Sequence, residues 1–122
     1  MKDISTKLTK KEEQVMELFW EYGAMFIREL QEKYDEPRPH FNTLSTVVRG
    51  LQSRGFIEFK TFGGSYQYFA AVSREQYSEL VVESVIDKYF DRPLSAVSAL
   101  VESEKISLDE LQELINLVKN NK

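Results

Sequence analysis

Side chains that could contact nucleic acid are concentrated in residues 37–57, a block that contains no Asp or Glu. The chain as a whole is acidic, because 20 Asp and Glu residues outnumber 16 Lys and Arg. Asn can make two hydrogen bonds to adenine, and the methyl group of Thr can contact that of thymine. A carboxylate on the same surface would be repelled by phosphate. The block therefore predicts a DNA-contacting surface with the candidate residues Asn42, Thr43, Thr46, Arg49 and Ser53.

A helical wheel brings these candidates together. At about 100° per residue, Leu44, Val48 and Leu51 form an apolar stripe on a helix over residues 41–54. The opposite face holds Asn42, Thr46, Arg49 and Ser53, and Thr43 lies on one flank. The start of such a helix also offers free backbone N–H groups to a phosphate. Short polar residues are equally common on a solvated helix face, so this face alone leaves both interpretations open.

A β-hairpin over residues 56–72 is the second candidate contact element. Two runs rich in aromatic and β-branched residues flank Gly63 and Gly64, which can take the positive φ values of a tight turn. Without side chains, this tip can approach a sugar–phosphate backbone closely. Lys60 adds a cation to the hairpin, and we expect the hairpin's aromatic residues mainly to pack beneath it. Two arginines outside the hairpin, Arg38 and Arg54, are either phosphate contacts or solubilising groups.

Catalysis and metal binding are not predicted. The sequence has no cysteine and one histidine, His40, so it lacks the ligands of a thiolate or multi-histidine metal site. It shows no nucleophile–base pair and no phosphate-cradling glycine loop. His40 directly precedes the third predicted helix, where it could act as the cap. We therefore expect a protein that is not an enzyme and that has no cofactor and no metal.

The elements that must position these side chains are mostly helical. Capping boxes pair a Ser or Thr with an acid or amide three residues later, and they predict helix starts at Thr9, Ser73 and Ser107. Apolar periodicity predicts further helices over residues 26–34 and 41–54, and a short one around residues 94–101. Prolines separate the second helix from the third, and the fourth from the fifth.

This order predicts a mainly α fold with a β-hairpin, in which a winged helix-turn-helix is followed by a C-terminal helical region. We expect a DNA-binding domain over residues 1–72 and a dimerisation region over residues 73–122. The second segment carries 10 acids against 6 bases, and its stripes are too apolar for a solvated tail. A homodimer would cover these stripes. The residues expected at the dimer interface are Tyr89, Phe90, Leu94, Val97, Leu100, Leu111, Leu114, Ile115 and Val118.

No apolar run is long enough for a transmembrane helix. The first residues lack the apolar core of a signal peptide. The simplest expectation is a cytoplasmic protein with no membrane partner.

The chain resembles the penicillinase-repressor (BlaI/MecI) family of bacterial transcription regulators over about residues 8–119. The resemblance rests on "LTKKEEQVMELFWEYG", "NTLSTVVRGLQSRGFI", "GSYQYFAAVSREQY" and "LDELQELINLV" in this order. It implies a homodimer that binds a palindromic operator through the winged helix and pairs through the C-terminal helices. It also implies an inducing partner, such as a sensor protease.

Several positions depart from the family pattern. Asn42 replaces a frequent lysine and Gly50 a frequent arginine, so the operator sequence is not carried over. The family's cleavage site is an Asn–Phe bond, and the aligned pair here is Ala99–Leu100. The copper-sensing branch uses C-terminal cysteines, which this chain lacks. The function expected is a sequence-specific dimeric repressor; the alternative is a winged-helix protein-interaction module that does not bind DNA.

Overall fold

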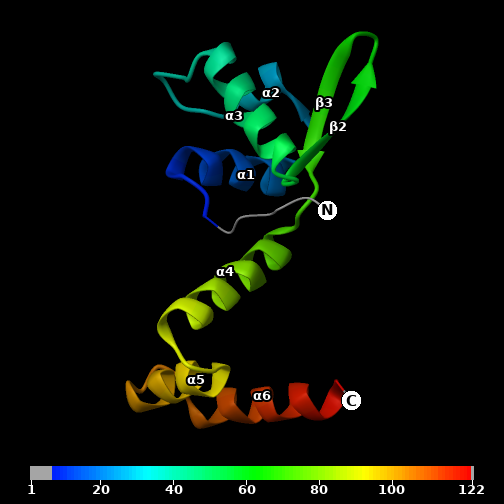
Figure 1. Ribbon diagram of the computed structural model, residues 1–122. Helices are drawn as coiled ribbons and strands as arrows, with labels where there is room; N and C mark the ends of the chain where they lie inside the picture. The colour runs from blue at the N-terminus through cyan, green and yellow to red at the C-terminus, as the bar shows by residue number, and fades with distance from the viewer. Residues whose placement is uncertain (1–6, 122) are drawn as a thin grey trace. The chain divides into compact units, whose positions relative to one another are not determined.

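The computed structural model describes residues 7–121 of the 122-residue chain (Figure 1). The chain divides into two compact units, one up to Val81 and one from Val82. The division by function expected after Val72 stays a prediction. The elements in chain order are α1 (Lys10–Tyr22), β1 (Met25–Phe26), α2 (Ile27–Glu32), α3 (Phe41–Ser53), β2 (Ile57–Phe62), β3 (Ser65–Ala70), α4 (Arg74–Tyr89), α5 (Pro93–Glu102) and α6 (Leu108–Asn120).

The predicted fold class is confirmed: three helices and a β-hairpin form a winged helix, and three more helices follow. The capping boxes form as expected. In the first, the Thr9 hydroxyl accepts a hydrogen bond from the Glu12 N–H at 3.2 Å, and the Glu12 carboxylate accepts one from the Thr9 N–H at 2.9 Å. The box at Ser73 pairs it with Gln76. The box that opens α6 pairs Ser107 with Glu110.

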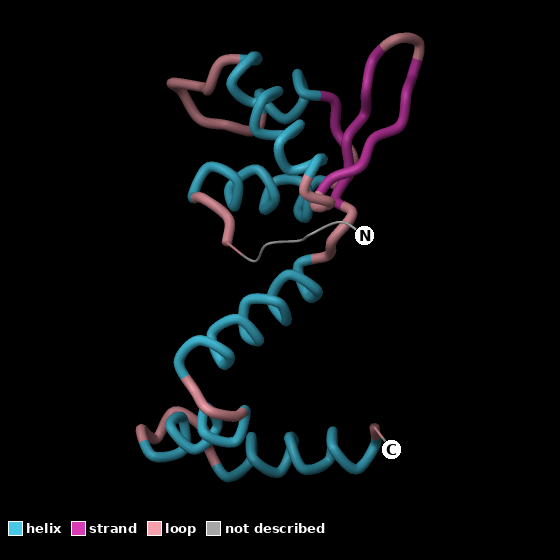
Figure 2. The backbone as a smooth tube through the Cα atoms, in the orientation of Figure 1, coloured by secondary structure: helices cyan, strands magenta, loops and turns pink. Residues whose placement is uncertain are grey.

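The wing is an antiparallel hairpin of β2 and β3 that extends beyond the helices to a narrow tip (Figure 2). Phe62 pairs with Ser65, and the two residues between them, Gly63 and Gly64, have φ values of 52° and 91°. Positive φ at both central residues is the geometry of a type I′ turn, which matches the twist of the strands. The sequence prediction of this turn is confirmed.

A third strand, β1, was not predicted. Met25 pairs with Tyr68 and Phe26 with Gln67, so β3 lies between β1 and β2 in the sheet. The predicted second helix, residues 26–34, is correspondingly shorter and covers Ile27–Glu32. Its first turn is fixed by the Glu29 carboxylate, which accepts a hydrogen bond from the Phe26 N–H at 2.8 Å.

The hydrophobic core of the described residues lies entirely between Leu8 and Val72. α3 contributes Leu44, Val48 and Leu51, each with 2 % or less of its surface exposed. Truncating one of these side chains to Ala is expected to destabilise the fold by about 2–5 kcal/mol, because a cavity remains. The winged helix therefore holds α3 firmly by its apolar stripe and leaves the opposite face outside.

The start of α4 packs on the winged helix. The ring of Tyr77 lies 5.8 Å from that of Trp20 and 6.0 Å from that of Phe56. The Trp20 indole N–H donates to the carbonyl oxygen of Val72 at 2.8 Å. The first turn of α4 thus belongs to the first compact unit, although the sequence places it in the second segment.

The second unit has a different character. None of the described residues of α4, α5 and α6 is buried. Leu108 is 81 % exposed, Tyr89 69 % and Val118 64 %. This much apolar surface in contact with water is unfavourable, by about 25 cal/mol per Å². Within residues 7–121, no helix is both long and apolar enough to span a bilayer.

Candidate nucleic-acid interface

The outer face of α3 is exposed and carries no acidic side chain. Asn42, Thr43, Thr46, Arg49 and Ser53 are all exposed, as the helical wheel predicts. α3 lies beside the hairpin within the first unit, so both candidate contact elements belong to one body (Figure 1). The helix has no acid in its first turn and no side-chain hydrogen bond at its N-cap. Its first N–H groups are therefore available to an external acceptor such as phosphate.

Two hydroxyl groups on this face are already committed as donors. The Thr46 hydroxyl donates to the Asn42 carbonyl oxygen at 2.9 Å, and the Ser53 hydroxyl donates to that of Gly50 at 3.0 Å. A hydroxyl has one hydrogen and two acceptor lone pairs. In this geometry both oxygens can accept from a base amino group, while the Thr46 methyl can contact a thymine methyl. The face thus combines acceptors with the amide of Asn42 and the guanidinium of Arg49.

The wing tip can approach a flat or grooved partner closely. A Cβ atom built on Gly63 or Gly64 would meet no heavy atom within 4 Å, so the tip is open to solvent. Lys60 is exposed on β2 opposite Gln67, with its ammonium 5.9 Å from the centre of the Phe69 ring. This weak contact leaves the Lys60 charge accessible.

Arg49 connects the two elements electrostatically. Burial raises the pKa of Tyr68 on β3, and the Arg49 guanidinium partly offsets that rise. The charge of Arg49 on α3 is therefore felt at Tyr68 on the wing.

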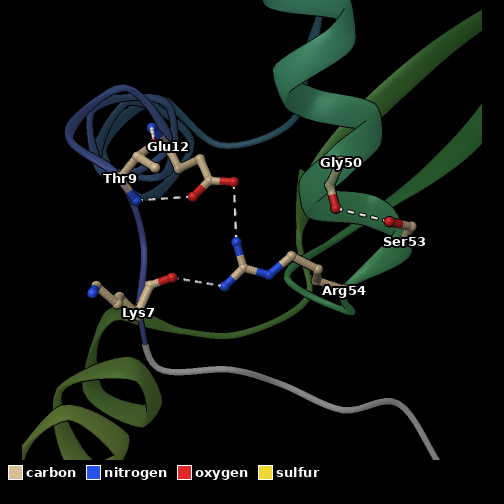
Figure 3. A network of polar contacts seen from close by, with 6 residues as sticks. All are labelled: Lys7, Thr9, Glu12, Gly50, Ser53 and Arg54. Carbon is tan, nitrogen blue, oxygen red and sulfur yellow. Dashed lines mark hydrogen bonds and ion pairs between the residues drawn. The ribbon is translucent and has the colours of Figure 1, made fainter.

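Arg38 and Arg54, the two arginines for which the sequence left phosphate contact and a solubilising role open, make different contacts. Arg38 is exposed in the connection between α2 and α3, where its Nε donates to the Tyr34 carbonyl oxygen at 3.0 Å and its Nη1 lies 3.7 Å from Glu36. Arg54 is not a solubilising group: it donates to the Glu12 carboxylate at 3.0 Å and to the Lys7 carbonyl oxygen at 2.9 Å (Figure 3). Arg54 therefore ties the end of α3 to the start of α1.

The same network sets the charge state of Glu12. Burial alone would raise the pKa of Glu12, but hydrogen bonds from the Thr9 N–H and the Arg54 guanidinium outweigh it and lower the pKa. The carboxylate is therefore ionised at neutral pH and holds both the cap of α1 and the end of α3 (Figure 3).

His40 occupies the N-cap position of α3, but its side chain makes no capping hydrogen bond. The position expected for His40, at the cap of the helix, is confirmed, and the capping contact is made by its backbone: the Leu44 N–H donates to the backbone oxygen of His40 at 3.1 Å. Among residues 7–121, no cluster of three or more His, Asp or Glu side chains could hold a metal ion.

Sequence reasoning did not predict the exposure of several aromatic side chains near this face. Phe62 is 53 % exposed and Tyr66 49 % exposed, and both belong to the wing. Phe41, the first residue of α3, is also exposed. Tyr68 is buried as expected, but Tyr66 packs at a tilt against Phe59, with 4.6 Å between ring centres, at the surface of the sheet.

The residues expected at a dimer interface, from Tyr89 to Val118, all lie in the second unit. Phe90, Val97 and Leu111 are half-buried. The others are exposed in the single chain: Tyr89, Leu94, Leu100, Leu114, Ile115 and Val118.

Comparison with known proteins identifies the family. The chain is similar to the methicillin resistance regulatory protein MecI of Mammaliicoccus sciuri, with 28 % identity over 118 residues, covering 92 % of this chain and 93 % of the relative. The MecI proteins of Staphylococcus aureus strain N315 and Staphylococcus epidermidis match with the same identity and coverage. The names of these relatives and of the family support a role for the chain as a transcriptional repressor rather than as an enzyme. The sequence profile described as "Penicillinase repressor" matches residues 8–120, and the chain therefore belongs to the penicillinase repressor family.

Proposed function

We propose that the protein represses transcription as a homodimer that binds a palindromic DNA operator through α3 and the wing. The observation that carries the proposal is the outer face of α3, which is exposed, acid-free and beside a hairpin that has two glycines at its tip and a lysine on β2. The described part of the winged helix combines this face with a core that fixes the helix from behind.

In this proposal α3 enters the major groove and reads bases. Asn42 offers a donor and an acceptor to adenine, and Arg49 offers donors to guanine. The Thr46 and Ser53 oxygens accept from base amino groups, because their hydrogens are bonded to the helix backbone. Contacts that do not depend on sequence would come from Thr43, Arg38, Lys60 and the N–H groups at the wing tip, Gly63 and Gly64.

The proposed dimer forms through the apolar faces of the C-terminal helices. These faces lack a cover within the described chain, and a second copy would remove them from water. Two winged helices would then read two half-sites whose centres lie about 34–36 Å apart, or a multiple of that distance. The residues proposed for this interface are Tyr89, Phe90, Leu94, Val97, Leu100, Leu111, Leu114, Ile115 and Val118.

Release from DNA requires an inducer, and two routes fit the chain. A protease could cut within α5, where Ala99 and Leu100 are both exposed, and so separate α6 from the rest. A partner or ligand could instead loosen the dimer or the DNA-binding surface. Both routes fit a protein that acts in the cytoplasm.

A second candidate is a protein-interaction module built on the same fold. The observation that favours it is the exposure of Phe62 and Tyr66 on the wing, because aromatic side chains are enriched in protein interfaces. In this case the wing would dock a protein, and α3 would remain a solvated face.

The test is to select duplexes from random DNA with the full-length protein and to measure their affinity by fluorescence anisotropy. Enrichment of a palindrome, together with a dimer in sedimentation analysis at micromolar concentration, would support the proposal. Failure to enrich any sequence would favour the interaction module, and a monomer would refute the dimeric mechanism.

A further inference from the structure

A second site lies on the other flank of α3, away from the wing. α1, the connection between α2 and α3, and the start of α3 together line a cavity of about 660 Å³ that is partly open to solvent. Pockets for small molecules typically have volumes of about 300–1,000 Å³. All of its lining residues lie between Lys11 and Val47, within the first compact unit. The cavity is therefore large enough for an organic ligand rather than a single ion.

The floor of this cavity is apolar. Val15 and Leu44 are buried core residues, and Leu18 and Val47 are half-buried side chains that complete the floor. A flat hydrocarbon body placed here would shield Leu18 and Val47 from water. Phosphate alone would gain nothing from these four side chains, so the floor favours a ligand with an apolar body.

The rim of the cavity is cationic. It includes Lys11, Lys33 and Arg38 against one carboxylate, that of Asp35. Lys11 has no ion-pair partner among residues 7–121. Arg38 is held in place by its Nε bond to the Tyr34 carbonyl oxygen, at 3.0 Å, and its contact with Glu36 is long and exposed. Charge complementarity therefore favours an anionic ligand.

Tyr34 supplies a neutral donor to the same cavity. Its side chain is half-buried, and within the described chain its hydroxyl has no hydrogen-bond partner. Burial raises the pKa of Tyr34, so its phenol stays protonated at neutral pH. A carboxylate bound among these groups would thus meet ammonium, guanidinium and phenol donors.

A second cavity of similar size provides the contrast. It encloses about 670 Å³ between α2, α3 and the wing, but its charged residues are Arg28, Glu29 and Glu32. Its net charge does not favour an anion. The cationic rim is thus a property of the first cavity and not of grooves on this winged helix in general.

We propose that the cavity between α1 and α3 binds an organic acid with an apolar body, and that this ligand weakens DNA binding. The regulatory part rests on the proposed function, because Thr43 both lines the cavity and is a proposed DNA contact. A ligand seated against Thr43 and Val47 would compete with the operator or shift the start of α3. The binding part stands whether or not the protein binds DNA.

The probe is 2-naphthoate, which has one carboxylate on a flat apolar body, and its neutral control is 2-naphthamide. Calorimetry with the full-length protein should detect binding of the naphthoate and at least roughly fivefold weaker binding of the amide, the size expected for two or three exposed charge contacts. The double variant Lys11→Gln/Lys33→Gln should lose affinity by a similar factor. The matched control Lys10→Gln/Lys105→Gln, which removes two lysines outside the cavity, should bind as the parent does.

If 2-naphthamide binds as strongly as 2-naphthoate, or if both double variants bind 2-naphthoate with equal affinity, the proposed anion site is refuted. NMR amide shifts confined to α5 and α6 would overturn it too, since they would place the probe on the exposed apolar faces. Weaker binding of all DNA by the Lys11/Lys33 variant, without any naphthoate binding, would assign these cations to the DNA interface instead.

The regulatory part is tested on a duplex selected from random DNA. Naphthoate at a concentration near its Kd for the parent should weaken binding of this duplex more in the parent than in the Lys11/Lys33 variant. If DNA affinity is unchanged while naphthoate is bound, the proposed regulation is refuted, but the proposal that the cavity binds an organic acid still stands. Absence of any DNA binding by the parent would instead refute the proposed function, and calorimetry would still decide the site.

Discussion

Thr46 provides the most direct test of the proposed reading face. Its side chain lies on the exposed side of α3, and its hydroxyl donates to the Asn42 carbonyl oxygen at 2.9 Å. Replacing it by Ala removes the acceptor oxygen and the methyl group together. The bond lost within the helix is exposed, and Ala favours helix more than Thr by up to about 0.7 kcal/mol. Thr46→Ala should therefore fold at least as stably as the parent.

The expected loss on DNA follows from what Thr46 can offer. With its hydrogen committed to the backbone, the hydroxyl can accept one hydrogen bond, which contributes about 0.5–1.5 kcal/mol. A methyl contact with thymine adds about 0.8 kcal/mol. Specific affinity should fall by roughly 1–2 kcal/mol per protomer, or about five- to thirtyfold, within the range of a base contact.

Two further substitutions separate the contribution of the Thr46 hydroxyl from that of its methyl group. Thr46→Val retains a methyl group and removes the oxygen, whereas Thr46→Ser retains the oxygen and removes the methyl. Ser78→Ala is a matched control, because the Ser78 hydroxyl makes the same bond to a carbonyl four residues earlier, at 2.8 Å to Arg74, on α4. It should leave DNA affinity unchanged.

The assay is fluorescence anisotropy with the selected duplex and a scrambled duplex of equal length. The ratio of the two affinities should decrease in Thr46→Ala. If both affinities fall equally, or neither changes, Thr46 does not read bases and the orientation of α3 on DNA is different from the one proposed.

The remaining predictions concern the wing, the dimer, the Glu12 network and induction. Lys60→Ala should weaken binding to all DNA sequences and reduce the slope of log affinity against log salt concentration by about 1. Anisotropy at several salt concentrations measures this slope, and the control Lys105→Ala should leave it unchanged. A chain ending at Val81 retains the whole described core, so it should be a folded monomer in sedimentation analysis. It should bind the operator roughly 10²- to 10⁴-fold more weakly than the full chain. A dimer of this shortened chain would contradict the proposed interface in the C-terminal helices. Folding lowers the pKa of Glu12, so the ionised carboxylate stabilises the folded protein at neutral pH, and this stabilisation is lost as the pH falls through the folded pKa. Glu12→Gln should therefore lower the urea midpoint of unfolding at pH 7 but not well below pH 4. An equal decrease of the midpoint at both pH values would contradict the network. During induction, an immunoblot showing a fragment that ends near Ala99 would support proteolysis, whereas an intact band alongside derepression would support a ligand or partner.

Local chemistry made much of the secondary structure predictable. Gly63 and Gly64 specify the wing turn because few other residues adopt positive φ at both positions. The boxes at Thr9, Ser73 and Ser107 form because both partners lie within four residues of each other. The exposed face of α3 follows from the spacing of Leu44, Val48 and Leu51, since one buried stripe fixes the orientation of the whole helix.

Features that depend on distant partners were not predictable in this way. β1 has two residues, and its strand geometry comes from pairing with Tyr68 and Gln67 more than forty residues later. Arg54 looked like a surface cation, but its partner Glu12 is 42 residues away. Tyr66 and Tyr68 lie two residues apart on β3 and therefore on the same face of the sheet. Tyr68 is buried and Tyr66 exposed because the covering of that face ends between them, towards the hairpin tip.

The sequence by itself therefore determined the helices, their caps, the wing turn and the polar face of α3, because hydrogen bonds and periodicities within a few residues specify them. Only the tertiary structure decided where the cations lie: Arg54 joins α1, whereas Lys11 and Arg38 line the cavity beside α3. The physical reason is that ion pairs, cavities and strand pairing are set by distances through space, and those distances exist only once the core between Leu8 and Val72 has brought α1, α3 and the sheet together.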